Sequence, residues 1–315
     1  MAKSFTKFKD RIWGVVDLAA RGIASAPKPI QDVGYGTLRG LLWAAYHAPR
    51  VPLKSTAADF AIVLGQGTAR SVYGGFVDRF VWALRRQEKL RLGATEETDA
   101  LLELPEQDRL DEIIRTHGSA VMAMPHCHSS LLMIRGLSTR YPVLMLVRES
   151  ADQSRADATR VYYNNLGAER LDVRNSSSVS VARSVLRALR EGKLVIGIVD
   201  RIKAAPAEGE DYNAHDDVNR CQAFGQTVGF PAWPARFAAR ARVPLLPVMV
   251  ELTQDKIVGH LGDPIDCTDQ MGATQACMNN LETMFLQYPH DWGFVYDKHW
   301  SRVMRGRAQE ISPQQ

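Results

Sequence analysis

The sequence lacks the features that mark membrane-spanning, secreted and disulfide-rich proteins. In its 315 residues no apolar run approaches the ~20 residues of a membrane-spanning helix. The N-terminal region contains no uninterrupted apolar stretch of the kind found in signal peptides. The four cysteines are scattered and form no C-x-x-C pair. We therefore expect free thiols in a reducing cytosol rather than disulfides or a zinc site. There is also no internal repeat and no low-complexity tract.

The chain also lacks a strong charge of either sign. Its formal net charge is +4, with 23% charged and 45% hydrophobic residues, which is ordinary for a globular protein. This mild positive excess is too small to imply nucleic acid, and we expect no nucleic-acid partner. A dinucleotide-binding fingerprint is missing too. Gly65 and Gly67 begin like one, but Arg70 stands where the third glycine belongs, and no strand precedes them. We expect these glycines to form a turn between two helices.

The first part of the chain, residues 1–95, is predicted to be a helical region. Residues 3–24 form an amphipathic pattern, with apolar residues near one face and several basic residues elsewhere. Two interpretations fit this pattern: a helix lying in an anionic membrane surface, or an ordinary packed helix with a solvated basic face. Pro27 and Pro29 end this helix. Further helices are expected over residues 36–47, 57–64 and 73–91.

Residues 96–315 change to alternating helices and strands, which predicts an α/β domain with a mainly parallel sheet flanked by helices. Short apolar runs predict strands at residues 120–124, 142–147, 169–173, 194–199 and 245–252. Helical spacing predicts helices at residues 107–116, 131–137, 157–165, 179–190 and 232–241. The polar segment 203–222 contains proline and glycine, and we expect it to be a loop that could serve as a mobile flap.

Polar side chains follow three of the predicted strands. His126 comes after the first strand, Arg148 after the second, and Asp200 with Arg201 after the fourth. Because parallel strands share one carboxyl edge, we expect these groups to converge over a common crevice. A histidine beside a carboxylate can act as a general base, and arginine can hold a phosphate. Each residue also has a purely structural interpretation, His126 as a turn residue and Asp200 as the N-cap of a helix.

His126 and His128 also allow a metal site, since many hydrolases take two ligands from an H-x-H segment after a strand. Such a site needs further ligands from other strand ends, and the other histidines do not fall at the predicted strand ends. We therefore predict no metal and keep a metal-dependent hydrolase only as an alternative. Whether His128 assists His126 or packs in the interior stays open.

The pattern from His126 almost to the C-terminus resembles the bacterial lipid A biosynthesis acyltransferases, within the lysophospholipid acyltransferase superfamily. In that family a strand delivers a histidine that opens an H-x4-D/E motif. A later strand ends in aspartate, and a polar loop, a Phe-Gly segment and a small-residue helix follow. The similar segments of this chain are residues 124–126 (MPH), 194–200 (LVIGIVD), 224–226 (FGQ), 233–238 (WPARFA), 243–248 (VPLLPV) and 288–292 (YPHDW) with Trp300.

The resemblance implies a glycerolipid acyltransferase-like fold and transfer of a fatty acyl chain from an acyl carrier protein or coenzyme A thioester. The acceptor would be a hydroxyl of a lipid A precursor, a lysophospholipid or a glycolipid. No cofactor is needed for this reaction. The protein would lie peripherally on the cytoplasmic face of the bacterial inner membrane, with its basic N-terminal region on anionic lipids. His126 would be the base, and the substrate would be contacted by His128, Arg148, Arg201, Phe224, Gly225 and Arg236.

The chain departs from the family at one position. Where the H-x4-D/E motif places its acid, this sequence has Leu131. We expect Asp200 to orient His126 in its place. The alternative is a catalytically impaired homologue that binds lipid or carrier protein.

Overall fold

The computed structural model describes residues 20–49, 51–150 and 152–312. Residues 20–25 are helical, whereas most of the predicted amphipathic helix over residues 3–24 lies outside the described residues. In the part of the chain that is described, no helix is both long and apolar enough to cross a membrane.

The described residues form a seven-stranded mixed sheet in the order β1-β10-β9-β2-β5-β3-β4. β10 runs antiparallel to β9, and β9, β2, β5, β3 and β4 run parallel to one another. The predicted α/β class, with a mainly parallel sheet flanked by helices, is thereby confirmed. The strands are β1 (Leu102–Glu103), β2 (Val121–Met124), β3 (Val143–Val147), β4 (Glu169–Asp172), β5 (Leu194–Ile198), β9 (Leu245–Leu252) and β10 (Ile257–Leu261).

The two strands at the middle of this sheet are apolar at nearly every position. All four residues of β2 are buried, and β5 is buried along most of its length. A parallel strand covered by helices on both faces needs apolar side chains on both faces. This explains why continuous apolar runs, rather than an alternation of apolar and polar residues, predict these strands. The predicted ends lie within about one residue of the observed ends. The two strands are in register with Ala123 opposite Gly197.

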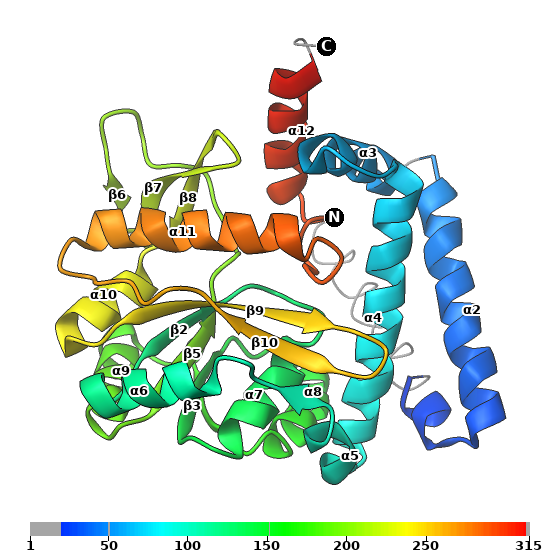
Figure 1. The fold of residues 1–315 in the computed structure, drawn as a ribbon, viewed down its shortest axis with the longest axis horizontal. Helices are drawn as coiled ribbons and strands as arrows, with labels where there is room; N and C mark the ends of the chain where they lie inside the picture. The colour runs from blue at the N-terminus through cyan, green and yellow to red at the C-terminus, as the bar shows by residue number, and fades with distance from the viewer. Residues whose placement is uncertain (1–19, 50, 151, 313–315) are drawn as a thin grey trace.

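Helices cover both faces of the sheet (Figure 1). On one face α9 (Ser178–Arg190) packs against β5, α10 (Trp233–Ala241) against β2 and α9, and α11 (Gln270–Gln287) against β9 and α10. On the opposite face lie α7 (Ser130–Ser138) and α8 (Gln153–Asn164). The right-handed crossovers of parallel strands explain this division. The chain moves from β2 to β3 to β4 through α7 and α8, and then turns back to β5 through α9.

Three helices of the N-terminal region stand beside the sheet (Figure 1). They are α2 (Lys28–His47), α3 (Leu53–Leu64) and α4 (Ala69–Arg91), and each begins earlier than predicted. At α2 the reason is proline, which can open a helix as well as end one. Pro27 is the N-cap of α2 and Pro29 lies in its first turn, where no N–H group is needed.

The turn between α3 and α4 contains the two glycines expected there. Gly65 and Gly67 both have positive φ angles, which only glycine adopts without strain. Helices α3 and α4 then contribute Phe60 and Leu90 to the same buried cluster as the central strands. The helical region and the sheet therefore share one hydrophobic core.

A small antiparallel sheet occupies part of the segment expected to be a loop. Its strands are β6 (Tyr212–Asn213), β7 (Val218–Ala223) and β8 (Gln226–Pro231), in the order β6-β7-β8. The loop prediction for residues 203–222 was therefore wrong at β6 and over nearly all of β7. Strand β7 buries small or weakly apolar residues between polar ones, so its alternation is faint in the sequence.

The remaining helices are α5 (Thr95–Asp99), α6 (Gln107–His117) and α12 (Trp300–Ile311). Of these three, the sequence predicted α6, over residues 107–116. Helix α12 packs against α3, and Trp300 at its start is fully buried beneath the site described next.

Candidate active site

The carboxyl ends of three neighbouring strands carry the candidate residues. β2, β5 and β3 are adjacent and parallel. His126 follows β2, Arg148 follows β3, and Asp200 and Arg201 follow β5. His126, Arg148 and Arg201 line one cavity, while Asp200 is fully buried behind His126. The structure thus brings together the strand-end residues that the parallel-sheet prediction grouped.

His126 and Asp200 form a directly bonded pair. The Nδ1 atom of His126 lies 2.5 Å from Oδ1 of Asp200, and the backbone N–H of His126 donates to Oδ2 of Asp200 at 3.0 Å. A carboxylate at Nδ1 favours the tautomer with the proton on that nitrogen, which leaves Nε2 as a free base. This is the arrangement of the histidine and carboxylate in a catalytic triad. Asp200 therefore supplies the carboxylate partner of His126, which Leu131 cannot supply.

Two C-terminal tryptophans hold Asp200 in place. The indole Nε1–H of Trp292 donates to Oδ2 of Asp200 at 2.9 Å, and that of Trp300 donates to the backbone oxygen of Asp200 at 2.6 Å. Asp200, Trp292 and Trp300 are all fully buried. A buried carboxylate is costly unless hydrogen bonds compensate it, and the Trp292 indole and the backbone N–H of His126 supply them. The sequence does not predict this role, although the two tryptophans in the C-terminal segment are the available signal.

Phe294 also fixes the orientation of the His126 ring by packing against its face. The two rings stack, with centroids 4.0 Å apart and planes 10° apart. The backbone N–H of Gly293 donates to the His126 oxygen at 2.7 Å. A Cβ atom at position 293 would lie 2.8 Å from that oxygen, so the approach requires glycine. The guanidinium of Arg201 lies over the same Phe294 ring, 5.5 Å from its centroid.

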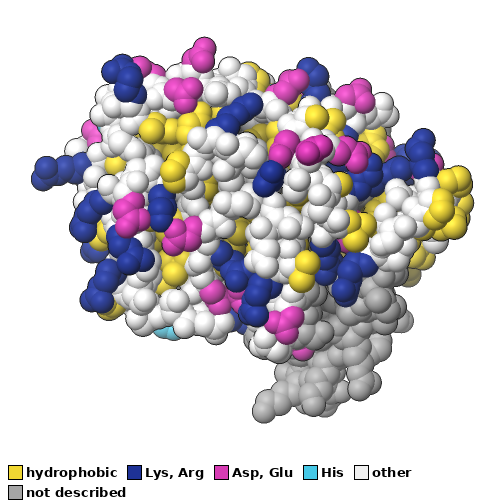
Figure 2. Space-filling model, turned by 90° about the horizontal axis from the view of Figure 1, so that it is seen from below, with side chains coloured by type: hydrophobic (Ala, Val, Ile, Leu, Met, Phe, Trp, Pro, Cys, Tyr) yellow, Lys and Arg dark blue, Asp and Glu magenta, His cyan; other side chains and the backbone are white. Residues whose placement is uncertain are grey.

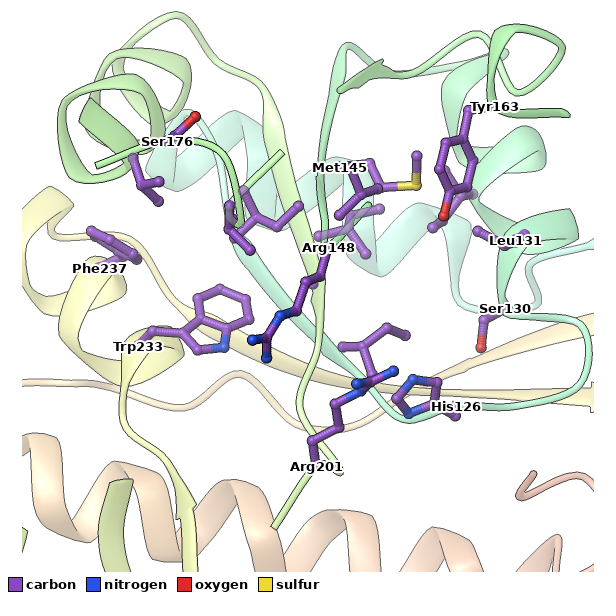
Figure 3. A pocket seen from close by; sticks show the side chains of 18 of the residues that line it. His126, Ser130, Leu131, Met145, Arg148, Tyr163, Ser176, Arg201, Trp233 and Phe237 are labelled. Atoms are coloured by element: carbon purple, nitrogen blue, oxygen red, sulfur yellow. The ribbon is translucent and has the colours of Figure 1, made fainter. Parts of the chain in front are cut away.

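A cavity of about 690 Å³ opens beside His126. Figure 3 shows Trp233 and Phe237 on one side of it, Leu131 and Tyr163 on the other, and Arg148 between them. Most of the wall is apolar, and the charged groups lie at the strand ends. Such a cavity fits a molecule with a long apolar part and a polar or charged group near His126.

Two of the predicted arginines are free to bind an anion. Within the described residues, neither Arg148 nor Arg201 has an ion-pair partner within 4.0 Å, and both point into the cavity (Figure 3). Arg236 also lines the cavity, but its guanidinium is already bound. It pairs with Asp217 at 2.7 Å and donates to the Tyr212 hydroxyl at 2.8 Å. Arg236 is therefore better placed to fasten the β6–β7 segment than to hold a substrate.

His128 lies in a different environment from His126. It is enclosed edge-on by Phe76 and Phe80, with centroids 4.7 and 5.7 Å away. Burial, with a smaller contribution from Arg79, lowers the pKa of His128 to about 3, so this ring is neutral at ordinary pH. Its Nε2 atom has no hydrogen-bond partner among the described residues. Across the described part of the chain, no group of three or more His, Cys, Asp or Glu is placed to hold a metal ion.

Three other residues have informative positions. Leu131, which stands where an H-x4-D/E motif would place its acid, lines the apolar wall of the cavity. Phe224 and Gly225 form the turn between β7 and β8, where both have positive φ, and neither lines the cavity. Phe224 instead packs beside Trp292 and Trp300. The structure therefore gives Phe224 a place in the support of Asp200 rather than a contact with the cavity, and Gly225 completes the turn.

Asp291 lies beneath the loop that carries His126. Its backbone oxygen accepts a hydrogen bond from the N–H of His128 at 3.1 Å, and its carboxylate accepts one from the N–H of Leu252 at 2.9 Å. The Arg79 guanidinium, 3.7 Å away, lowers the pKa of Asp291, but burial outweighs it and raises this pKa to about 7.

We expect Asp291 to make the free energy of unfolding fall as the pH rises from about 4 to about 7. In this window the folded protein keeps the proton and the unfolded chain loses it. Asp291→Asn retains an oxygen for the Leu252 N–H and should remove this pH dependence. Its free energy of unfolding should exceed that of the wild type by about 1–4 kcal/mol across the window. Urea unfolding at both ends of the window measures the difference in the free energy of unfolding between variant and wild type. The opposite contribution of His128 is present in both proteins and therefore cancels. The exposed Asp263→Asn serves as control, and a constant difference between Asp291→Asn and wild type would contradict the assignment.

The sequence was compared with family models and with curated proteins. No family model matches the sequence. No curated protein matches it significantly.

Proposed function

We propose that the protein is an acyltransferase that moves a fatty acyl chain from a thioester to a hydroxyl of a lipid. The observation that carries this proposal is the His126–Asp200 pair beside a mainly apolar cavity of about 690 Å³. A general base next to an apolar cavity suits a substrate with a long hydrocarbon chain and a reacting carbonyl or hydroxyl at its end. The resemblance of residues 124–126, 194–200 and 288–292 to the lysophospholipid acyltransferase superfamily supports it, and we propose that superfamily's fold for the α/β part.

In this reaction His126 acts as the base. Asp200 holds Nδ1–H, so Nε2 takes the proton of the acceptor hydroxyl as its oxygen attacks the thioester carbonyl. A C–O bond forms, and the carbonyl π electrons move to the oxygen of a tetrahedral intermediate. When the C–S bond breaks, the protonated His126 returns its proton to the leaving thiolate. The products are an ester and a free thiol, and no cofactor takes part.

The free arginines supply positive charge around this step. Arg201 lies beside His126 and Arg148 lies in the middle of the cavity (Figure 3). A guanidinium can stabilise the oxyanion or hold a phosphate of the donor or the acceptor. Leu131 on α7 suggests an impaired homologue, because it cannot pair with His126. The pairing of Asp200 with His126 favours an active enzyme instead, since a carboxylate that follows β5 takes this role.

Acyl transfer from labelled thioesters tests the proposal. The protein is incubated with a bacterial lipid extract and with either an acyl carrier protein or a coenzyme A thioester as donor. A labelled lipid formed with at least one donor supports the proposal, and chromatography of that lipid begins to identify the acceptor. Hydrolysis without any lipid product, or no consumption of either thioester, would contradict it.

We also propose that the protein lies peripherally on a membrane surface, at the cytoplasmic face of the bacterial inner membrane. Ile30, Val33 and Leu41 are 57%, 71% and 63% exposed and recur at helical spacing on α2. They form what we call the α2 stripe. Figure 2 shows apolar side chains at the right edge of the molecule, over α2. An exposed apolar stripe on an amphipathic helix can enter the boundary between headgroups and acyl chains.

Replacing the α2 stripe by serine (Ile30→Ser, Val33→Ser, Leu41→Ser) should lower binding to anionic vesicles about tenfold or more, because the apolar contact with lipid is lost. Vesicle sedimentation measures the bound fraction. A variant with Val161→Ser and Leu286→Ser, exposed apolar residues on α8 and α11, is the matched control and should bind like the wild type. Equal binding by the stripe variant and the control would refute this surface as the membrane contact.

A further inference from the structure

The cavity continues on both faces of the sheet edge. Side chains alternate between the faces along each strand, and a Cβ atom at Gly197 would lie 3.4 Å from Cβ of Leu146. Leu146 and Gly197 therefore share one face, and Met145 and Ile196 point to the other. All four line the cavity. The cavity thus has two apolar lobes that meet at the strand ends, where His126 and the two free arginines lie.

We call the lobe on the Leu146 and Gly197 face the α10 lobe. Its wall includes Trp233 and Phe237 of α10, which Figure 3 shows on the side of the cavity away from His126. The two rings pack together, with centroids 6.4 Å apart. The wall of this lobe is therefore a pair of large, mutually supported aromatic side chains.

The backbone of β5 is shaped for the Trp233 ring. A Cβ atom at Gly197 would lie 2.6 Å from both Cζ2 and Cη2 of the indole, closer than any real contact of this kind. The ring therefore lies directly on the strand. Glycine in the middle of a buried strand lowers its stability, and close approach of another group is a recognised reason for keeping it. With any larger residue at position 197, the indole would be displaced from the strand and into the lobe.

We infer that Trp233, seated on Gly197, is the end wall for the fatty acyl chain and limits the length of chain that the α10 lobe accepts. The inference rests on the proposed acyl transfer. Each methylene that finds room in the lobe adds about fourfold to affinity, and each one beyond the wall adds nothing. Affinity should therefore rise with chain length and then level off at a length set by the position of the indole.

Equilibrium binding of saturated fatty acids from octanoate to stearate tests this inference without requiring turnover. Displacement of a fluorescent fatty acid gives the affinity for each length. Trp233→Ala should move the levelling-off to longer chains, with a gain of about tenfold for the longest, and Gly197→Ala should move it to shorter chains. The double variant Gly197→Ala with Trp233→Phe should return toward the wild-type length, because the smaller ring leaves room for the Cβ atom. Gly40→Ala on α2, where an added Cβ meets nothing within 4 Å, is the matched control.

The outcomes separate this inference from the proposed function. If folded Trp233→Ala and Gly197→Ala proteins, checked by circular dichroism, both keep the wild-type length profile, the inference is overturned while the proposed function stands. If the wild type binds no fatty acid and consumes no acyl thioester, the proposed function fails. If Gly197→Ala does not fold, Trp233→Ala and Trp233→Phe alone decide, since both should lengthen the accepted chain.

Discussion

Replacing His126 by alanine is expected to lower the rate of acyl transfer about 10³- to 10⁴-fold. Its imidazole lies at the cavity with Nδ1 held by Asp200, which leaves Nε2 to take a proton, and general base catalysis is typically worth about 10²- to 10⁴-fold. Binding of the substrates should change little, because the cavity wall and the free arginines remain. Initial rates at saturating thioester measure the effect.

The control for His126→Ala is His117→Ala, at the exposed C-terminal end of α6. It removes an imidazole far from the cavity and should keep wild-type activity. An His126→Ala protein that retains more than about a tenth of the wild-type rate would show that the reaction does not use this base.

Replacing Asp200 by asparagine is expected to lower the rate about 10²- to 10⁴-fold while the protein stays folded. The amide keeps an oxygen for the indole of Trp292 or the N–H of His126, but it no longer presents two equivalent carboxylate oxygens. The carboxamide also cannot stabilise the positive charge that His126 gains when it takes the proton. The thioester assay measures the rate, and circular dichroism reports the fold.

Asp263→Asn is the matched control for Asp200→Asn, since the Asp263 side chain is 89% exposed and forms an ion pair with Arg109 at 3.3 Å. Full activity of Asp200→Asn would mean that His126 needs no carboxylate partner. In that case the short His126–Asp200 contact would have a structural role only.

The sequence predicted the central strands and the residues at their ends because both follow from local patterns. β2, β3, β5 and β9 are short apolar runs, and a parallel sheet places all their carboxyl ends at one edge. The grouping of His126, Arg148 and Arg201 needed no knowledge of distances. The choice of Asp200 as partner of His126 also follows, since β2 and β5 turned out to be neighbours.

The support of Asp200 could not be predicted in the same way. Trp292 and Trp300 lie 92 and 100 positions from Asp200 in the sequence, and no local pattern specifies which buried carboxylate an indole will reach. The same holds for Phe294, which stacks on His126. These contacts depend on how the C-terminal segment crosses beneath the sheet edge, which only the tertiary structure decides.

The hairpin of β7 and β8 was missed for a different reason. The buried positions of β7 are held by Val218, Asn219, Cys221 and Ala223, of which one is polar and two are small. Small side chains at such positions give weak alternation, and the preceding proline and glycine residues favour a loop. Phe224 and Gly225 were expected to contact the substrate because their segment resembles the Phe-Gly segment of the acyltransferases, whereas the Phe224 ring packs on the tryptophans beneath Asp200.

The most direct test of the account compares three proteins in one acyl-transfer assay. Wild type, His126→Ala and Asp200→Asn are given the same radiolabelled thioester and the same bacterial lipid extract, and the labelled lipid is quantified over time. We predict one labelled lipid product from the wild type and a loss of at least about 10²-fold in its rate of formation in both variants. A wild type that forms no labelled lipid, or variants that form it as fast as the wild type, would contradict the claim that the His126–Asp200 pair catalyses acyl transfer.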